Sequence, residues 1–263
     1  MDDYRRVNIL MGQPDYQTPP DFPNKESMKL LFWNCRETGN NTFKRNLTEI
    51  LRIHKPDILV LMETKVSLSS MGMFFNNLGF TASTSVDPTG EFGGIWILWD
   101  NLTVNVRVSS ANYQAIHTTV HKESYDDWVL SAVYASPLLR NRDQFWGEME
   151  AMAENMTTPW LVAGDFNDFA TQGERRSFTP NSNVGRNNKF LERISNCNLM
   201  DLGCSDPKLT WTNNRQGMAN TKERLDRALC NAAWSSLFPG CTVRNLPRTY
   251  SDHSLFVVFT EGV

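Results

Sequence analysis

The sequence predicts a mixed α/β protein in which two mostly antiparallel sheets pack face to face and helices lie outside them. Two features carry this prediction: a strand–helix–strand pattern near the start, and a run of short strands without helices in the middle. The length of 263 residues fits one large domain. A hydrophobic content of 40%, with 11% aromatic residues, is sufficient for a packed core and excludes a disordered chain.

Residues 1–27 are polar and contain four prolines, a composition typical of a flexible leader or linker. We therefore expect one folded domain over residues 28–263. The N-terminus lacks an apolar signal core, and no run of about eighteen apolar residues occurs anywhere. The sequence thus predicts no association with a membrane.

The expected domain opens with Lys29–Asn34, a strand buried on both faces. A helix capped by Asn40 or Asn41 follows and ends at Pro56. Its apolar residues fall on one face: Phe43, Leu47, Ile50 and Leu51. Asp57–Met62 is expected to be a second buried strand, with Glu63 at its C-terminal edge.

The middle of the chain is expected to form antiparallel sheet, after a loosely helical stretch over Ser67–Leu78. The expected strands are Phe80–Ser85, Gly94–Trp99, Thr103–Val108, Tyr113–His121 and Trp128–Tyr134. Arg142–Asn155 is helical in pattern, and Pro159–Ala163 is the next buried strand.

A long polar loop, Asn167–Arg186, follows this strand, and loops of that length are uncommon unless they bind something. Beyond it the pattern alternates between helix and strand. The expected helices are Asn187–Cys197 and Ala232–Leu237, and the expected strands are Leu209–Asn213, Arg224–Leu229, Cys241–Leu246 and Leu255–Thr260.

The composition limits the possible partners and cofactors. Lys and Arg number 26 against 29 Asp and Glu, a net charge of −3, so an anionic substrate must be met by a local basic patch or by metal ions. The five cysteines show no C-x-x-C spacing, which argues against a zinc knuckle and a disulfide framework. Reduced thiols in an intracellular protein are expected.

The segment Gly164–Asp165–Phe166–Asn167 places two polar side chains directly after a buried strand. Asp165 and Asn167 are two residues apart, so in an extended chain they point to the same side. Strand ends of this kind are where α/β proteins usually carry their chemistry. An Asx-rich turn explains these residues equally well, so the rest of the chain must decide.

The same placement, at or just after a buried strand, recurs for six further polar residues: Asn34, Glu63, Tyr134, Asp226, Asp252 and His253. Each alone has a structural explanation as a cap, a solvated charge or a satisfied core residue. Together they supply hard oxygen ligands and one imidazole. Glu63 with Asp252 or Asp165 suits Mg²⁺, and Asp226 can hold His253 in one tautomer. These are the groups that phosphodiester hydrolysis needs.

Five short motifs resemble those of the endonuclease/exonuclease/phosphatase superfamily, which includes DNase I and the exonuclease III-type abasic endonucleases. They are W-N, E-T, G-D-F-N, R-L-D and S-D-H, in this order. Longer strings resemble the endonuclease domain of plant LINE-type (non-LTR) retrotransposons: Val133–Pro137, Pro159–Asn167, Leu209–Arg215, Glu223–Leu229, Leu246–Arg248 and Ser251–Ser254. The resemblance runs from about Met28 to Thr260.

This resemblance implies a four-layered DNase I-like sandwich and a role for each motif residue. Glu63 would be the main metal ligand, assisted by Asn34, and Asp252 would bind metal or orient the site. The implied cofactor is Mg²⁺, with Mn²⁺ as a substitute. The implied catalytic residues are Asp165, which activates water or protonates the leaving oxygen, Asn167 and Tyr134 on the phosphate, and His253 oriented by Asp226.

Arg36 departs from the pattern, because abasic endonucleases carry an acidic residue there, near the metal. This argues against an abasic-site activity and fits the retroelement branch better. The resemblance and the local charges suggest a set of DNA contacts: Arg140, Arg142, Arg175, Arg176, Thr210, Trp211 and Arg215, with Lys44 and Arg45 as further candidates. For Trp211, a core position is as good an explanation.

The expected function is therefore a Mg²⁺-dependent endonuclease that nicks double-stranded DNA and leaves a 3′-hydroxyl able to prime reverse transcription. The alternatives are a phosphatase or phosphodiesterase acting on a small molecule or lipid phosphoester, and an inactive nucleic-acid-binding relic. No reverse transcriptase segment follows Val263, so we expect an excised domain, a truncated element or a fragment retained by a host. We also expect a nuclear monomer.

Overall fold

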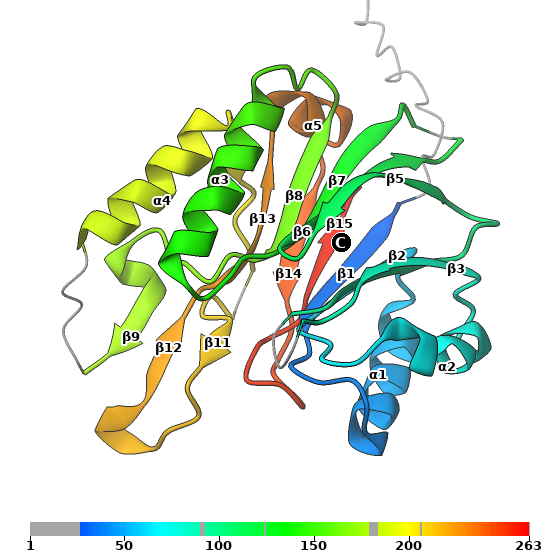
Figure 1. Ribbon diagram of the computed structural model, residues 1–263, viewed down its shortest axis with the longest axis horizontal. Helices are drawn as coiled ribbons and strands as arrows, with labels where there is room; N and C mark the ends of the chain where they lie inside the picture. The colour runs from blue at the N-terminus through cyan, green and yellow to red at the C-terminus, as the bar shows by residue number, and fades with distance from the viewer. Residues whose placement is uncertain (1–26, 90–92, 124, 179–183, 206, 263) are drawn as a thin grey trace, which may run out of the picture.

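Two six-stranded sheets packed face to face form the centre of the computed structural model, which describes residues 27–89, 93–123, 125–178, 184–205 and 207–262 (Figure 1). The first sheet has the order β14-β15-β1-β2-β4-β3. Its strands are β1 Lys29–Asn34, β2 Ile58–Met62, β3 Ala82–Val86, β4 Ile95–Trp99, β14 Thr242–Asn245 and β15 Phe256–Phe259. The predicted leader over residues 1–27 lies outside the described residues except for Ser27.

The second sheet has the order β10-β13-β8-β7-β6-β5. Its strands are β5 Asn105–Asn112, β6 Ala115–His121, β7 Trp128–Tyr134, β8 Trp160–Asp165, β10 Met200–Asp201 and β13 Asp226–Cys230. Each large sheet contains one parallel pair, β1 with β2 and β7 with β8, and its other pairs are antiparallel. The predicted pair of mostly antiparallel sheets is confirmed.

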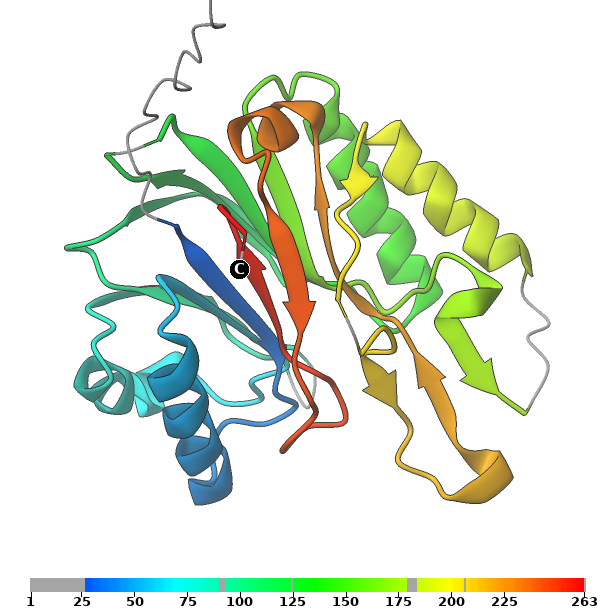
Figure 2. The same cartoon turned by 180° about the vertical axis from the view of Figure 1, so that it is seen from behind.

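Helices cover the outer face of each large sheet and complete the four layers (Figures 1 and 2). The helices are α1 Asn41–His54, α2 Gly72–Asn77, α3 Leu139–Ala153, α4 Val184–Asn196 and α5 Ala232–Leu237. The predicted cap of α1 is Asn40, whose side chain accepts a hydrogen bond from the backbone N–H of Phe43. The helix ends at Lys55 in the left-handed conformation, directly before Pro56.

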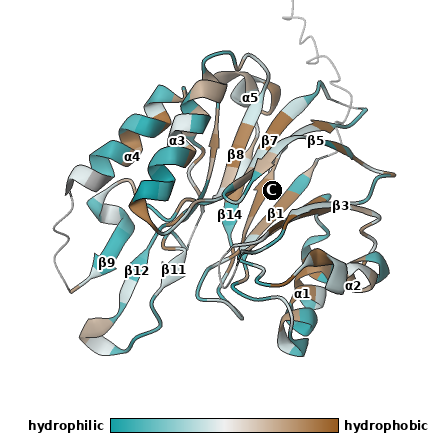
Figure 3. Cartoon of the chain, viewed as in Figure 1, coloured by the Kyte–Doolittle hydropathy of each residue, from teal (hydrophilic) through white to brown (hydrophobic). Residues whose placement is uncertain are grey.

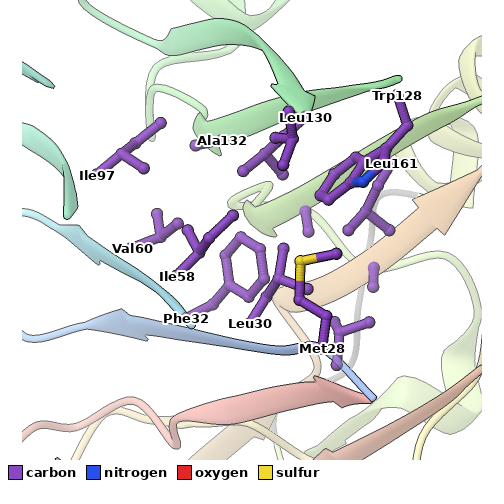
Figure 4. Packing of buried hydrophobic residues seen from close by; sticks show 14 of the residues in the cluster. Met28, Leu30, Phe32, Ile58, Val60, Ile97, Trp128, Leu130, Ala132 and Leu161 are labelled. Carbon is purple, nitrogen blue, oxygen red and sulfur yellow. The ribbon is translucent and has the colours of Figure 1, made fainter. Parts of the chain in front are cut away.

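The main core lies between the two sheets, where alternate side chains of facing strands meet (Figure 4). Leu30 and Phe32 of β1 belong to the same buried cluster as Leu130 of β7 and Leu161 of β8. The residues between them in sequence face outward and pack under the helices, Leu31 under α1 and Val162 under α3. This is why the central strands are hydrophobic along their whole length, whereas the helices are polar on their outer sides (Figure 3).

A third, small sheet was not predicted. It consists of β11 Trp211–Thr212, β12 Thr221–Glu223 and β9 Arg175–Ser177, and it extends from the end of the sandwich (Figure 1). Two short 3₁₀ helices accompany it, η2 Gln172–Glu174 and η3 Gly217–Ala219. The prediction of an irregular loop over Asn167–Arg186 is therefore wrong for Gln172–Ser177. The first half of this stretch is η2, and the second half is β9, which pairs with β12 more than forty residues later.

Other elements differ from the predictions mainly at their ends. Helix α3 begins three residues earlier than predicted, at Leu139, and α4 also begins three earlier, at Val184. The predicted stretch Ser67–Leu78 divides into a 3₁₀ helix, Leu68–Ser70, and α2. The predicted strand Leu209–Asn213 shrinks to Trp211–Thr212, since this short strand pairs with β12 of the small sheet.

Candidate active site

The catalytic candidates continue the inward-facing rows of side chains at one end of the sandwich. Asn34 follows Leu30 and Phe32 at alternate positions of β1, and Tyr134 follows Leu130 and Ala132 in β7. Asp165 ends β8, and Asp226 begins the antiparallel neighbour β13 directly opposite it. Strand periodicity and register therefore bring together residues that lie far apart in the sequence.

Gly164 allows β7 and β8 to approach closely beside the site. A Cβ atom at this position would lie 2.0 Å from the backbone oxygen of Val133, and φ is +144°. The glycine is thus required inside the strand, since β8 continues to Asp165. The chain does not turn at this glycine; the turn comes later, at Asn167, whose φ is +48°.

Four buried residues, Asn34, Asp165, Asp226 and His253, form what we call the histidine cluster. His253 Nδ1 donates to Asp226 Oδ2 over 2.9 Å, because an ionised carboxylate can only accept. The other ring nitrogen, Nε2, is 3.8 Å from Asp165 Oδ2 and 3.5 Å from Asn34 Nδ2. Asn34 Nδ2 also donates to Asp165 Oδ2 over 2.9 Å. The predicted Asp226–His253 pair is therefore present.

Burial and charge shift the pKa values in this cluster. Burial lowers the pKa of His253, but the carboxylates of Asp226 and Asp165 outweigh it and raise the pKa to about 9. The pKa of Asp165 rises to about 6, because burial and the charge of Asp226 outweigh the nearby imidazole. At neutral pH, His253 is therefore cationic and Asp165 is mostly ionised.

Asn167 and Tyr134 border the cluster on the side of the cleft. The Asn167 backbone N–H donates to Asp165 Oδ1 over 2.8 Å, and its side-chain amide donates to Ala135 O over 2.8 Å. This Asx-type turn places the Asn167 amide beside the Asp165 carboxylate. The two explanations of this segment, an Asx-rich turn and a functional site, are therefore compatible. Burial and the charges of Glu63 and Asp165 raise the pKa of Tyr134, which stays protonated and can donate to an anion.

Glu63 and Asp252, the two carboxylates predicted to bind metal, form a second acidic site that we call the carboxylate pair. The third predicted metal residue, Asn34, lies in the histidine cluster, where it donates to Asp165. Arg36 Nη1 contacts Asp252 Oδ2, and its Nε is 3.9 Å from Glu63 Oε1. Lys65 Nζ lies 3.4 Å from Glu63 Oε1. Trp211 Nε1 donates to Asp252 Oδ2 over 3.0 Å, so this indole orients the carboxylate.

The carboxylate pair fits a divalent cation. Both groups already face one positively charged side chain, that of Arg36, and both offer the hard oxygen atoms that Mg²⁺ or Mn²⁺ prefers. A second set of ligand-type atoms, from Asp165, Asp226 and His253, lies within 4.8 Å of one another. In that set the Nδ1 atom of His253 is used by Asp226, which leaves Nε2 and Asp165 toward the cleft.

One cleft of about 310 Å³ exposes both sites. Its lining includes Tyr134, Asp165, Asn167 and His253 together with Arg36, Glu63 and Asp252. A neighbouring recess of about 370 Å³ shares Tyr134 and Pro137 with the cleft and is walled by Tyr113 and Leu138. Four of the six catalytic candidates therefore line one opening, and Asn34 and Asp226 lie behind them in contact with Asp165 and His253.

A basic groove of about 540 Å³ runs along the small sheet. Four cationic residues line it: Arg176, Arg215, Lys222 and Arg248. Trp211 and Glu223 of the same sheet line the catalytic cleft, so the groove adjoins the cleft. Two residues of the suggested DNA-contact set, Arg176 and Arg215, lie in this groove.

The other members of that set lie elsewhere. Arg140 is exposed at the start of α3, and Lys44 and Arg45 lie on α1. Arg175 is half-buried, and its Nε donates to Glu223 Oε1 over 2.9 Å. Trp211 is half-buried at the rim of the cleft.

Two of the suggested contacts are wrong, because both side chains are buried. Arg142 is 1% exposed, donates to the backbone oxygens of Ser136 and Pro137, and lies 3.4 Å from Asp168. Thr210 is fully buried, and its hydroxyl accepts from the backbone N–H groups of Leu225 and Asp226. Arg142 holds the loop after β7, and Thr210 holds the start of β13.

Sequence reasoning gave no role to Lys65, Lys222 or Arg248. Arg248 belongs to one of the resembling strings, and Lys222 lies four residues before Asp226. Both residues are basic and lie close to motif residues in the sequence, but the small sheet beside which they meet was not predicted. Lys65 follows the E-T motif by one residue, which was the only available signal.

A buried His–Asp pair, further carboxylates and amide donors around one cleft define a hydrolase acting on phosphoesters. The chain belongs to the Endonuclease/Exonuclease/phosphatase family, whose sequence profile matches residues 31–253. The members of this family are metal-dependent phosphoesterases. The predicted family membership is confirmed. A search of curated protein sequences finds no match.

Solved structures of low sequence identity share the fold. An AP endonuclease from Leishmania major superposes with a TM-score of 0.68 at 16% identity, covering 93% of this chain and 90% of its own. A 3′ phosphatase, NExo from Neisseria, bound to a product DNA hairpin, gives 0.64 at 18%, with 88% and 98% covered. The endonuclease domain of TRAS1, a telomere-specific non-LTR retrotransposon, gives 0.64 at 14%, with 88% and 97% covered. None of the helices among the described residues has the length and apolar content needed to cross a bilayer.

Proposed function

We propose that this protein is a divalent-metal-dependent endonuclease that nicks one strand of double-stranded DNA and leaves a 3′-hydroxyl. We further propose that Mg²⁺ is its cofactor, that it acts as a monomer in the nucleus, and that the nick primes reverse transcription of a LINE-type element. The LINE-like strings in the sequence support this specific role, as does the shared fold with the TRAS1 domain.

The observation that carries the proposal is the basic groove beside the catalytic cleft. The whole chain has a net charge of −3, yet four cationic residues line this one groove. A small phosphoester would fit within the cleft and would have no use for cations beyond it. A polyanion that continues past the scissile phosphate would bind both surfaces, because its neighbouring phosphates attract Arg and Lys.

The residues of the cleft can divide the work of hydrolysis among them. Asp165, mostly ionised at neutral pH, can take the proton of the attacking water. The cationic His253 can donate from Nε2 to the phosphate, and Asp226 holds its ring in place. Tyr134 and the Asn167 amide can donate to the remaining phosphate oxygens. Water adds to phosphorus and the bond from phosphorus to the 3′-oxygen breaks. That oxygen takes a proton from the surrounding water, which balances the proton that Asp165 removes.

Glu63 and Asp252 would hold the divalent ion. When bound, that ion supplies Lewis-acid stabilisation of the negative charge that develops on the phosphate. Asn34 assists by holding Asp165, to which its side chain donates.

The test is an incubation of the protein with supercoiled plasmid and Mg²⁺. We expect open-circular product that a DNA polymerase extends without prior phosphatase treatment, because the nick ends in a 3′-hydroxyl. EDTA, Asp165→Ala and His253→Ala should each abolish nicking, and both variants should keep a cooperative thermal unfolding transition, which shows that they fold. Wild-type protein that nicks no faster than these variants would overturn the proposal.

The apolar recess favours a second candidate, a phosphodiesterase or phosphatase for a small phosphoester. Tyr113, Pro137 and Leu138 could bind the organic group of such a molecule while its phosphate lies beside Tyr134. Bis(p-nitrophenyl) phosphate distinguishes the two candidates. Rapid hydrolysis of this compound together with intact plasmid would favour the small substrate.

A further inference from the structure

Arg36 reaches from solvent onto two poorly exposed carboxylates. Its side chain is 56% exposed, whereas those of Glu63 and Asp252 are 16% and 3% exposed. Nη1 contacts Asp252 Oδ2, and Nε lies 3.9 Å from Glu63 Oε1. The guanidinium therefore holds a position between the two groups that are expected to bind the metal ion.

The backbone supports this arrangement with unusual conformations. Arg36, Glu63 and Lys65 all have left-handed φ values, +62°, +55° and +59°. Residues other than glycine rarely adopt this conformation, and such residues gather at functional sites. Three residues in this conformation thus carry two cations and one anion, and both cations approach the anion, Glu63.

The local charges balance without a metal ion. Glu63 and Asp252 carry two negative charges, and Arg36 and Lys65 carry two positive ones. Asp252 Oδ2 accepts from both Trp211 and Arg36, so this oxygen is already satisfied. A divalent ion that binds through this oxygen must therefore take the place of the Arg36 guanidinium.

We propose that Arg36 is a tethered cation that competes with the divalent metal ion for Glu63 and Asp252. The side chain satisfies the carboxylate pair in the metal-free enzyme and swings away when the ion binds. Its exposed position allows this movement, since most of the side chain lies in solvent. The inference rests on the proposed function only in taking Glu63 and Asp252 as metal ligands, and it does not require DNA to be the substrate.

The test measures Mn²⁺ binding without DNA, from the electron paramagnetic resonance signal of the free ion. Arg36→Asn removes the charge and suits the left-handed backbone. We expect it to bind Mn²⁺ about tenfold more tightly than wild type, since a cation beside both ligands is removed. Glu63→Gln on the same background should abolish the gain, which assigns it to this site.

Lys65→Asn is the matched control, because Lys65 is also left-handed and also lies beside Glu63, but it has no contact with Asp252 among the interactions of the described residues. We expect at most about a threefold gain from it. Equal gains from the two variants, or no gain from Arg36→Asn, would overturn the proposal. Absence of Mn²⁺ binding in every variant would overturn it as well, together with the metal site.

A thermal shift measurement provides a second readout. A metal ion that binds the folded state more tightly stabilises it more, so Mn²⁺ should raise the melting temperature of Arg36→Asn more than that of wild type. If that variant does not fold, Arg36→Lys serves instead. A lysine keeps the charge but loses the planar fork, so its affinity for Mn²⁺ should rise about threefold, and an unchanged affinity would contradict the proposal. If plasmid nicking fails while these shifts appear, only the proposed endonuclease activity is lost.

Discussion

Two clusters of charged residues lie on opposite faces of β13, where their members Asp226 and Arg227 are adjacent in the sequence. Asp226 faces the interior between the sheets and belongs to the histidine cluster. Arg227 faces outward, under α4, where its guanidinium lies 5.0 Å from the ring of Phe190. Together with Arg224, Glu174 and Asp201 it forms what we call the arginine network, with ion pairs of 2.8–2.9 Å.

The two clusters differ in charge balance and in access. In the arginine network two cations meet two anions, and each carboxylate binds both guanidinium groups. Burial raises the pKa values of Glu174 and Asp201, but the arginines outweigh it and hold both below their usual range. In the histidine cluster one imidazole serves two carboxylates, and the pKa of Asp165 rises instead.

This difference supports the proposal that the histidine cluster, and not the arginine network, does chemistry. Burial and ion pairing are common to both clusters, so neither identifies an active site. What distinguishes the histidine cluster is an unbalanced charge and a ring nitrogen that faces a cleft of about 310 Å³. The arginine network instead connects η2, β10 and β13, three elements spread over about 50 residues of the chain.

The largest effect is expected from Asp226→Asn, which preserves the shape of the histidine cluster and removes the charge that orients His253. Plasmid nicking should slow by about 10³-fold, because the ring loses its fixed tautomer and part of its positive charge. The pKa of His253, measured by NMR titration in EDTA, should fall from about 9. Nicking at the wild-type rate would mean that the pair is structural, like the arginine network.

A dependence of stability on pH should also separate the clusters. The folded state holds the proton of His253 up to about pH 9, whereas the unfolded chain releases it near 6.5. The resulting stabilisation is complete below pH 6.5 and is lost as the pH rises through about 9. The free energy of unfolding in EDTA should therefore fall between pH 7 and 10 by more in wild type than in His253→Gln. Parallel curves would contradict the raised pKa.

Arg227→Met tests the arginine network with a side chain of similar length. Glu174 and Asp201 would lose one of their two cations, at a cost of about 3 kcal/mol in the free energy of unfolding. Nicking by the folded fraction should stay within about threefold of wild type. Urea denaturation measures the first quantity, and Arg107→Met, on the exposed side of β5, is the control. A large loss of activity without loss of stability would erase the contrast between the clusters.

The sequence predicted the histidine cluster well for a physical reason. Asn34, Asp165 and Asp226 end or begin strands that are hydrophobic along their length, and His253 lies three residues before β15, so these polar residues stand out. The register of β8 and β13 then pairs Asp165 with Asp226. The two sheets followed from the same buried runs. Their order did not, since hydrophobic periodicity carries no information on which strands pair.

The small sheet and the arginine network escaped prediction because long-range contacts stabilise them. Strand β9 has three polar residues and no apolar alternation, and it depends on pairing with β12 and on Glu174 binding Arg224. The same limit explains the difference between Arg140 and Arg142. Both residues lie in the first turn of α3. Arg142 is buried because it lies on the inner face of the helix and donates to the carbonyl groups of Ser136 and Pro137, whereas Arg140 lies on the exposed face.

Thr210→Val should have smaller effects, one on the stability of the protein and one on the rate of nicking. The hydroxyl accepts from the buried backbone N–H groups of Leu225 and Asp226, so its loss should cost about 2 kcal/mol of stability. Because Asp226 loses an anchor, the maximal nicking rate should fall while DNA affinity is unchanged. Thr210→Ser keeps the hydroxyl and should behave as wild type. Weaker DNA binding by Thr210→Val, with wild-type stability, would instead support the DNA contact that the sequence suggested for Thr210.

The smallest effect concerns the surface that both clusters lack, the basic groove. Arg215 is exposed there, near Arg176 and Lys222. Arg215→Ala should weaken binding to duplex DNA of any sequence and should lower the slope of log affinity against log salt by about one, since one phosphate contact is lost. Arg107→Ala removes an exposed charge on β5 and should leave the slope unchanged. Equal slopes for wild type and Arg215→Ala would remove this residue from the DNA path, because a charge that meets a phosphate must release a counterion.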